Sequence, residues 1–152
     1  MASLMKGGSR SDKSKIVLVD MDGVIVDYEL GYERAVSALF PGMDLIPREE
    51  RKVFYSDVQY SELYPEHREE FQRIAVTPRF FRDMPIMKGA KEALEKLNGR
   101  YTLFICSAPM TLFHDCVREK YEWVEEHLGF EFTKQIILTR DKTVVSGKIN
   151  RL

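Results

Sequence analysis

The sequence predicts an α/β protein: a Rossmann-like core of three layers, with a parallel sheet and a small helical cap inserted after the first strand. Three observations lead to this prediction. Three short apolar runs each end in polar residues. Stretches with helical periodicity lie next to these runs, as in βαβ units. About eighty residues separate the first run from the second, whereas a crossover connection needs only a dozen or so.

The three apolar runs are the expected strands. The first, residues 16–19, is four consecutive apolar residues, three of them β-branched, as in a strand buried on both faces of a parallel sheet. Residues 101–106 and 135–138 are the second and third. Because ligands of open parallel sheets bind at the carboxyl ends of the strands, the polar residues that follow are the candidate site.

Two helices are expected between the strands. Residues 90–97 are followed by Asn98-Gly99, a common signal for the end of a helix. Residues 111–128 show a long amphipathic pattern that ends at Gly129. Its expected apolar face consists of Leu112, Phe113, Val117, Tyr121, Val124 and Leu128. Trp123 on the same helix is interpreted as a packing residue.

The long insertion predicts a cap domain. Residues 28–84 contain three helix-like pieces, at 28–40, 48–55 and 66–75, and prolines interrupt them. Its position directly after the first polar strand end suits a lid over a site. We therefore expect a disordered tail over residues 1–14, a core made of 15–27 and 85–152, and a cap over 28–84.

Composition excludes several classes of function. Lys and Arg total 23 against 24 Asp and Glu, a net charge of −1, which argues against a nucleic-acid polymer or an anionic membrane as partner. No apolar run approaches the roughly 20 residues of a membrane span. Cys106 and Cys116 form no disulfide framework, so we expect reduced thiols. The polar, basic start lacks the apolar region of a secretory signal, and we expect a cytoplasmic rather than a mitochondrial protein.

The residues Asp20-Met21-Asp22-Gly23 carry the clearest chemical signal. One aspartate before a glycine usually serves a turn or a helix cap. Two carboxylates after a buried strand are costly unless a cation or another partner compensates them. Beside Mg²⁺, one carboxylate can attack phosphorus and the second can transfer protons.

The segment VLVDMDGVIVD resembles the first motif of the haloacid-dehalogenase-like phosphatases. The resemblance implies that Asp20 is the nucleophile and Asp22 the acid–base. It also implies that Mg²⁺ binds the Asp20 side chain and the Asp22 backbone carbonyl. Ser107, with the backbone N–H groups that follow it from Ala108, matches the second motif and suits a phosphate near a helix start. Lys142 matches the third motif. Taken singly, Ser107 would be a helix cap and Lys142 a surface lysine.

Two further segments, EKYEWVEEHLGFEF and QIILTRDKTVVSG, resemble the 5′(3′)-deoxyribonucleotidases, the pyrimidine nucleotidases. This resemblance implies a nucleoside monophosphate substrate such as dUMP or dTMP, and a possible homodimer. It also places substrate-binding side chains at Tyr28, Phe54, Tyr55, Phe81 and Arg140. The alternative is that the aromatic residues form the core of the cap and that Arg140 is a solvated charge.

The resemblance departs from the family pattern after Gly147. Family members have a further strand that ends in two acidic residues, one of which supports Mg²⁺, whereas this sequence reads Lys148-Ile149-Asn150-Arg151-Leu152. Two hypotheses follow. The first is a Mg²⁺-dependent 5′-nucleotidase. The second is a truncated, weak or inactive form that lacks the C-terminal strands and binds nucleotide or a full-length partner.

Overall fold

The computed structural model describes residues 11–145. Its sheet contains β1 (Ile16–Val19), β2 (Thr102–Ser107) and β3 (Ile136–Leu138), all parallel and in the order β1-β2-β3. Val19 pairs with Ile105, and Ser107 pairs with Leu138. The carboxyl ends of the three strands therefore meet at one edge of the sheet, as the sequence predicted.

Burial explains why these residues form strands. Val17, Leu18 and Val19 of β1 are buried, and so are Leu103 and Ile105 of β2. β3 lies at the edge of the sheet, and its three residues are only partly buried. The β-branched and aliphatic side chains thus occupy the covered part of a pleated surface.

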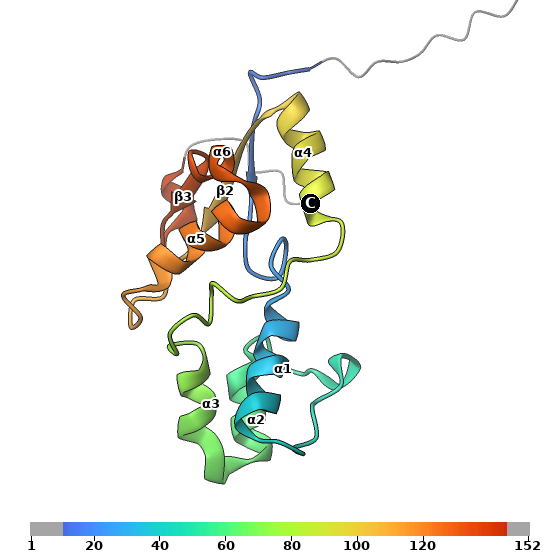
Figure 1. The fold of residues 1–152 in the computed structure, drawn as a ribbon, viewed down its shortest axis with the longest axis vertical. Coiled ribbons are helices and arrows are strands. Elements are labelled where there is room, and N and C mark those ends of the chain that lie inside the picture. The colour runs from blue at the N-terminus through green and yellow to red at the C-terminus, as the bar shows by residue number, and fades with distance from the viewer. Residues whose placement is uncertain (1–10, 146–152) are drawn as a thin grey trace, which may run out of the picture.

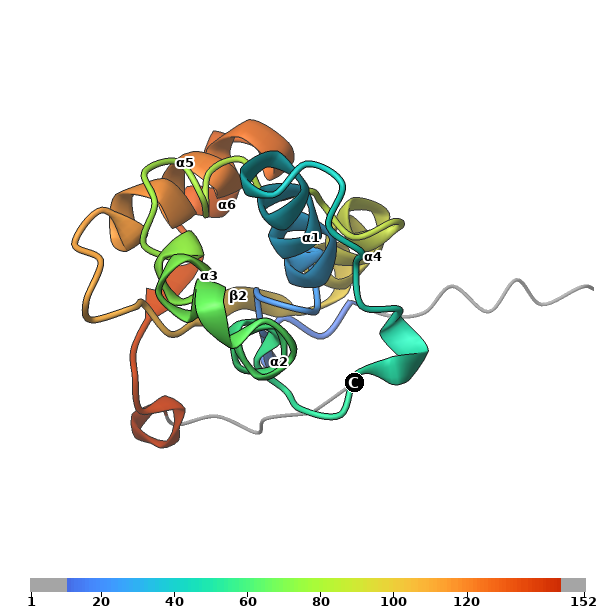
Figure 2. The same cartoon turned by 90° about the horizontal axis from the view of Figure 1, so that it is seen from below.

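The helices of the core are α4 (Ala90–Arg100), α5 (Cys116–Leu128) and α6 (Phe130–Thr133). Strand order advances in one direction, so right-handed crossovers place the connecting helices on one face of the sheet. Figure 2 shows α4, α5 and α6 on the same side of β2. Leu94 of α4, Trp123 and Val124 of α5, and Phe132 of α6 bring these helices into the same hydrophobic core as the strands. The described residues thus build the sheet and one helical layer of the expected arrangement.

The cap forms the lower lobe in Figure 1. It contains α1 (Tyr28–Leu39), α2 (Ser56–Leu63) and α3 (Arg68–Ile74), with short 3₁₀ helices η1 (Arg48–Glu50) and η2 (Pro65–His67). Tyr32, Tyr60 and Phe71 pack their rings together at its centre. The two chain segments that join cap and core lie side by side, because the amide of Asp27 donates to Pro85 (2.8 Å) and that of Met87 donates to Ile25 (2.8 Å).

Some predicted helix bounds were wrong. The expected helix at residues 48–55 is reduced to η1, and α2 begins only at Ser56. α4 continues through Asn98-Gly99, because the amide of Tyr101 still donates to the carbonyl of Leu97 in the helical pattern. α5 begins at Cys116 rather than at residue 111.

The expected tail is partly ordered. Residues 11–14 are bonded to the core: the amide of Asp12 donates to the carbonyl of Arg100 (2.6 Å), and the Thr102 hydroxyl donates to that of Lys13 (2.7 Å). The rest of the expected tail, residues 1–10, lies outside the described residues, and so does the segment Lys148–Leu152. No helix within residues 11–145 is both long enough and apolar enough to cross a membrane.

Candidate active site

The nucleophile candidate Asp20 directly follows β1. Its Oδ1 accepts a hydrogen bond from the amide of Met21 (2.8 Å) and lies 2.7 Å from Nζ of Lys142. Lys142 belongs to η3 (Lys142–Val144), the short 3₁₀ helix that follows β3. Asp141 caps η3, because its carboxylate accepts from the amide of Thr143 (2.9 Å). The structure therefore brings together the first and third motifs from opposite edges of the sheet.

A turn carries the chain from Asp20 to Asp22 and into the cap. Gly23 adopts a φ of +76°, a left-handed conformation that suits glycine, and its amide donates to the carbonyl of Val26 (2.9 Å). The amides of Ile25 and Val26 both donate to the carbonyl of Met21 (3.0 Å each). This bonding fixes the two aspartates at the point where core and cap meet.

Asp22 has a partner that the sequence did not predict. Nζ of Lys120, in the middle of α5, donates to Asp22 Oδ2 (2.5 Å) and to Oγ of Ser107 (2.9 Å). Lys120 is only 1% exposed. Its ammonium also lies 4.8 Å from the ring centre of Phe81, on the chain segment that returns from the cap. Because a buried ammonium requires a compensating anion, Lys120 and Asp22 depend on each other.

The two ion pairs balance the charge of the site. Asp20 faces Lys142 and Asp22 faces Lys120, so two carboxylates meet two ammonium groups. One oxygen is left over: Oδ1 of Asp22 is buried and has no hydrogen-bond partner among the described residues. Since a buried acceptor without a partner is costly, this oxygen is available to a proton, a water or a ligand.

The second motif is also at this edge. Ser107 ends β2 and is fully buried, and its hydroxyl lies 3.5 Å from Asp22 Oδ2, a long contact. Ala108 follows it and is exposed. The expected helix start close to Ser107 was wrong, because residues 111–115 form a turn and Leu112 is exposed. Phosphate recognition through Ser107 and Ala108 would therefore use the loop rather than the α5 N-terminus.

Two of the four aromatic candidates lie beside this constellation. Phe81 is buried against Lys120 and packs edge-on against Phe80 (5.2 Å). Tyr28, the first residue of α1, packs edge-on against Phe80 (5.7 Å). Burial raises the pKa of the Tyr28 hydroxyl well above its usual value, and the negative charge of Asp22 raises it further.

The other candidates are more peripheral. Phe54 is 91% exposed, and its ring packs edge-on against that of Tyr55, which is also exposed (5.1 Å). No aromatic contact joins this pair to Tyr28 or Phe81 within residues 11–145. Arg140, in the loop after β3, donates to the hydroxyl of Thr111 in the loop after β2.

The site offers few carboxylate ligands for a metal ion. Within residues 11–145 there is no group of three or more His, Cys, Asp and Glu side chains that could hold an ion. Mg²⁺, however, commonly binds through one or two carboxylates and completes its shell with water and substrate phosphate. The half-exposed carboxylate of Asp20 fits this kind of site.

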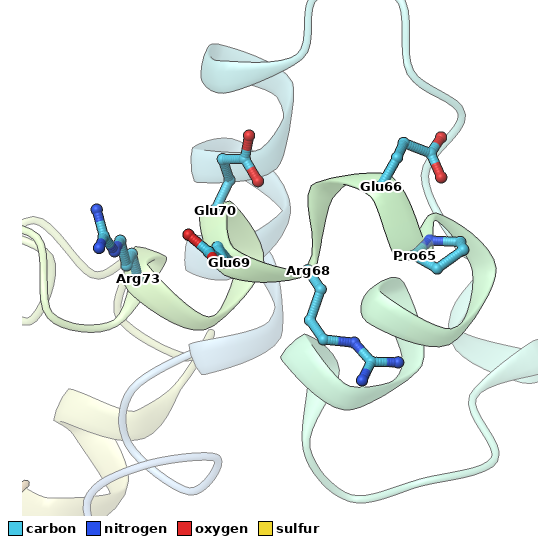
Figure 3. A pocket seen from close by; sticks show the side chains of 6 residues that line it. All are labelled: Pro65, Glu66, Arg68, Glu69, Glu70 and Arg73. Carbon is cyan, nitrogen blue, oxygen red and sulfur yellow. The ribbon is translucent and has the colours of Figure 1, made fainter.

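A separate hollow lies on the cap. Its lining comes from η2 and α3, and Figure 3 shows that the side chains are mostly charged: Pro65, Glu66, Arg68, Glu69, Glu70 and Arg73. None of these residues belongs to the constellation at the strand ends. The chemistry thus points to the sheet edge and not to this hollow.

The position of Lys120 on α5 was a signal in the sequence from which its burial could have been predicted. Lys120 lies four residues after Cys116 and four before Val124, so it shares their face of α5, and Glu119 borders the same face. The predicted apolar face was displaced: Val117 and Tyr121 are exposed, while Cys116, Glu119, Lys120 and Trp123 are buried. Charged residues are rarely buried without a partner, so their presence on the buried face of an amphipathic helix indicates a specific ion pair or hydrogen bond.

Comparisons with known proteins agree with the motifs. A family model described as "5′ nucleotidase, deoxy (Pyrimidine), cytosolic type C protein" matches residues 14–150. The chain is 42% identical to the human cytosolic 5′(3′)-deoxyribonucleotidase, over 90% of this chain and 69% of that protein. It is 41% identical to the mouse mitochondrial enzyme of that name and 42% identical to the human mitochondrial one. Those matches cover 91% and 88% of this chain, but only 64% and 59% of the two relatives.

Solved structures give the fold. A HAD-hydrolase from Bacillus subtilis, crystallised bound to magnesium, aligns with a TM-score of 0.54 at 17% identity, over 87% of this chain and 66% of that one. A phosphatase from Clostridium difficile aligns with a TM-score of 0.52 at 18% identity, over 85% and 62%. The fold is therefore haloacid-dehalogenase-like, and the chain belongs to the family of cytosolic type C 5′ nucleotidases, deoxy (pyrimidine).

Proposed function

We propose that this chain hydrolyses the phosphate ester of pyrimidine (deoxy)ribonucleoside monophosphates such as dUMP and dTMP. The observation that supports this most strongly is the pair of ion pairs at the sheet edge. Lys142 lies 2.7 Å from Asp20 and Lys120 lies 2.5 Å from Asp22. Each carboxylate thus has its own lysine partner. Two carboxylates in different environments can take different roles, one as the nucleophile and the other as the acid–base.

In the proposed reaction, Asp20 attacks phosphorus and an aspartyl phosphate forms. The bond between phosphorus and the nucleoside oxygen breaks, and Asp22, which takes up a proton on its partnerless Oδ1 before this step, gives that proton to the nucleoside oxygen. Asp22 then removes a proton from water, which attacks the aspartyl phosphate. Inorganic phosphate leaves and the Asp20 carboxylate is restored. This sequence needs a nucleophile and an acid–base within reach of one phosphate.

The supporting groups have separate roles in this proposal. Lys142 orients Asp20 and faces the phosphate oxygens, and the Ser107 hydroxyl and the Ala108 amide bind those oxygens. The side chain of Asp20 and the backbone carbonyl of Asp22 would hold Mg²⁺. When bound, this ion would offset the negative charge that gathers on the phosphate. The magnesium in the Bacillus subtilis hydrolase supports the choice of ion.

The nucleoside would lie between core and cap. Tyr28 and Phe81 border the site: the partly exposed ring of Tyr28 offers an apolar face to a base, whereas Phe81 lies buried behind it against Lys120. Phe54, Tyr55 and Arg140 are proposed as further substrate contacts from the surrounding loops. The exposure of Phe54 and Tyr55 supports this role, since aromatic pairs of this kind are available to a ligand.

The test is phosphate release by the purified chain. With Mg²⁺ and dUMP, wild-type protein is expected to release phosphate, and Asp20→Asn is expected to abolish release because an amide is a poor nucleophile. Lys91→Met, a change on the exposed side of α4, serves as the control. Calorimetry with dUMP runs in parallel: binding without release above the Asp20→Asn level would reject hydrolysis by this chain. A cytosolic location and a homodimer remain predictions, to be tested by microscopy and by light scattering.

A further inference from the structure

Glu119 is a buried acid that the proposed reaction does not use. It precedes Lys120 on α5 and is only 2% exposed. Both of its carboxylate oxygens bind the segment that returns from cap to core, which we call the return linker (residues 75–89). Oε1 accepts from the amide of Arg79 (2.6 Å), and Oε2 accepts from the amide of Phe81 (3.1 Å).

The return linker has an unusual backbone at this point. Arg79 has a φ of +71°, and it is the one residue other than glycine with a positive φ among residues 11–145. A left-handed residue turns nearby amides toward one side of the chain, where they form an anion-binding concavity. Here the anion is the carboxylate of Glu119. Because a side chain makes this conformation unfavourable, the linker needs a strong partner to keep it.

The linker places the ring of Phe81 over the ion pair between Lys120 and Asp22. Phe81 is buried, and its ring lies 4.8 Å from Nζ of Lys120, which in turn donates to Asp22 and Ser107. Glu119 and Lys120 are neighbours on one helix, so the same turn of α5 holds both the linker and Asp22. A shift of the linker therefore uncovers Lys120.

We propose that Glu119 is a positioning residue that clamps the return linker to α5 and thereby fixes Phe81 over the Lys120–Asp22 pair. The proposal rests on the proposed function for its kinetic consequence. Its structural part stands on the contacts alone. Glu119 touches no reacting atom; it acts through the linker and through Phe81.

The structural test uses Glu119→Gln, which keeps the size of the side chain but removes the charge and replaces one acceptor with an NH₂ group. Hydrogen exchange of the Arg79 and Phe81 amides and tryptic cleavage after Arg79 are both expected to become at least tenfold faster. Labelling of Lys120 by an acylating reagent, read by mass spectrometry, is expected to rise as well. Glu125→Gln, on the exposed face of the same helix, is the matched control and should change none of these rates.

Two further variants test whether Glu119 acts on Lys120 through the return linker and Phe81. Phe81→Leu keeps the backbone amides and therefore the clamp, so it should expose Lys120 to labelling while Arg79 stays protected. Arg79→Gly keeps the amide but removes the unfavourable conformation, so adding it to Glu119→Gln should restore protection of the Phe81 amide. If Glu119→Gln does not fold, the Phe81→Leu labelling result still decides the matter: an unlabelled Lys120 overturns the proposal.

The kinetic test separates positioning from stability. Measured well below the melting temperature, kcat for dUMP is expected to fall about ten- to a hundredfold in Glu119→Gln, as for other small misplacements of reacting groups, and to recover in the double variant with Arg79→Gly. An unchanged kcat with a lower melting temperature would show a merely structural role. Failure of the wild-type chain to hydrolyse dUMP would reject the proposed function and leave the exchange and labelling results standing.

Discussion

Lys120 reaches from the middle of α5 to the carboxylate of Asp22, 98 residues earlier in the chain, and donates to it at 2.5 Å. The lysine is almost wholly buried, whereas Asp22 keeps about a third of its side-chain exposure. Water can therefore screen the aspartate if the lysine is lost. The pair is consequently better suited to holding the carboxylate in place than to stabilising the fold.

Lys120→Met is thus expected to lower both activity and stability. The free energy of unfolding should fall by about 1–3 kcal/mol, because Asp22 and Ser107 each lose a donor at a largely buried site. The kcat for dUMP should fall about ten- to a hundredfold. Urea unfolding and phosphate release measure the two quantities. Lys134→Met, an exposed lysine paired with Glu131, is the control. A large loss of stability with unchanged kcat would contradict this prediction.

Lys142→Met is expected to act on the phosphate. Lys142 and Asp20 are both partly exposed, so their ion pair should contribute less than about 1 kcal/mol to stability. The loss of the ammonium should raise KM for dUMP and lower kcat, because both the phosphate and Asp20 lose a positive neighbour. Steady-state kinetics at several phosphate concentrations would show this as weaker inhibition by inorganic phosphate. Equal inhibition of wild type and variant would show that Lys142 does not face the phosphate.

The sequence predicted the part of the site that depends on local patterns. Asp20 and Lys142 directly follow apolar strands, and a parallel sheet brings such ends together whatever the connections are. Lys120 and Glu119 depend instead on the rotation of α5 about its axis. Leu112 and Phe113 extended the apparent apolar pattern toward the N-terminus and displaced the predicted face. The partners of these two residues, Asp22 and the return linker, are distant in sequence and give no periodic signal.

In the cap, too, the sequence predicted the elements that depend on local patterns and missed those that depend on tertiary contacts. The pieces at residues 28–40 and 66–75 were predicted close to their true positions because they begin near Asp27 and Pro65, which are ordinary helix-start residues. The piece at 48–55 was wrong, because tertiary contacts take its polar groups. Arg51 donates to Glu33 (3.0 Å) and to Ser56 (2.6 Å), and the amide of Lys52 donates to the side chain of Gln59 (3.0 Å).

Gly31→Ala is expected to destabilise the junction of cap and core. A Cβ at Gly31 would lie 2.1 Å from Sδ of Met84 and 3.2 Å from Cδ of Pro85. Met84 is buried, so it has little room to move, and overpacking of this kind costs about 1–3 kcal/mol. Gly99→Ala in α4, where nothing lies within 4 Å, is the control and should stabilise by up to about 1 kcal/mol.

The clash between a Cβ at Gly31 and the side chain of Met84 predicts that substitutions at these two positions are not additive. Met84→Ala removes the sulfur that a Cβ would meet, so the double variant should be more stable than the sum of the two single changes by at least about 0.5 kcal/mol. Urea unfolding of the four proteins gives the coupling energy. Strictly additive effects would mean that α1 moves away from Met84 instead of pressing on it.

Three tyrosines of the cap make stability depend on alkaline pH. Burial is the main cause that raises the pKa of the Tyr28, Tyr32 and Tyr60 hydroxyls above the usual value of about 10. A raised folded-state pKa means that the stabilisation is fully present below pH 10 and is lost as pH rises toward the folded-state value. The free energy of unfolding should therefore fall above pH 10, by up to about 1.4 kcal/mol per pH unit for each tyrosine.

Tyr32→Phe tests the contribution of one hydroxyl. Tyr32 donates to the carbonyl of Phe71 (3.0 Å), so the variant should be less stable at pH 8, but its stability should fall less steeply between pH 10 and 11. Urea unfolding across this range gives the slopes, and absorbance at 295 nm follows tyrosine ionisation. Tyr55→Phe is the matched control, since it removes the hydroxyl of an exposed tyrosine. Equal slopes for wild type and Tyr32→Phe would show that Tyr32 ionises as readily in the folded protein as in the unfolded chain.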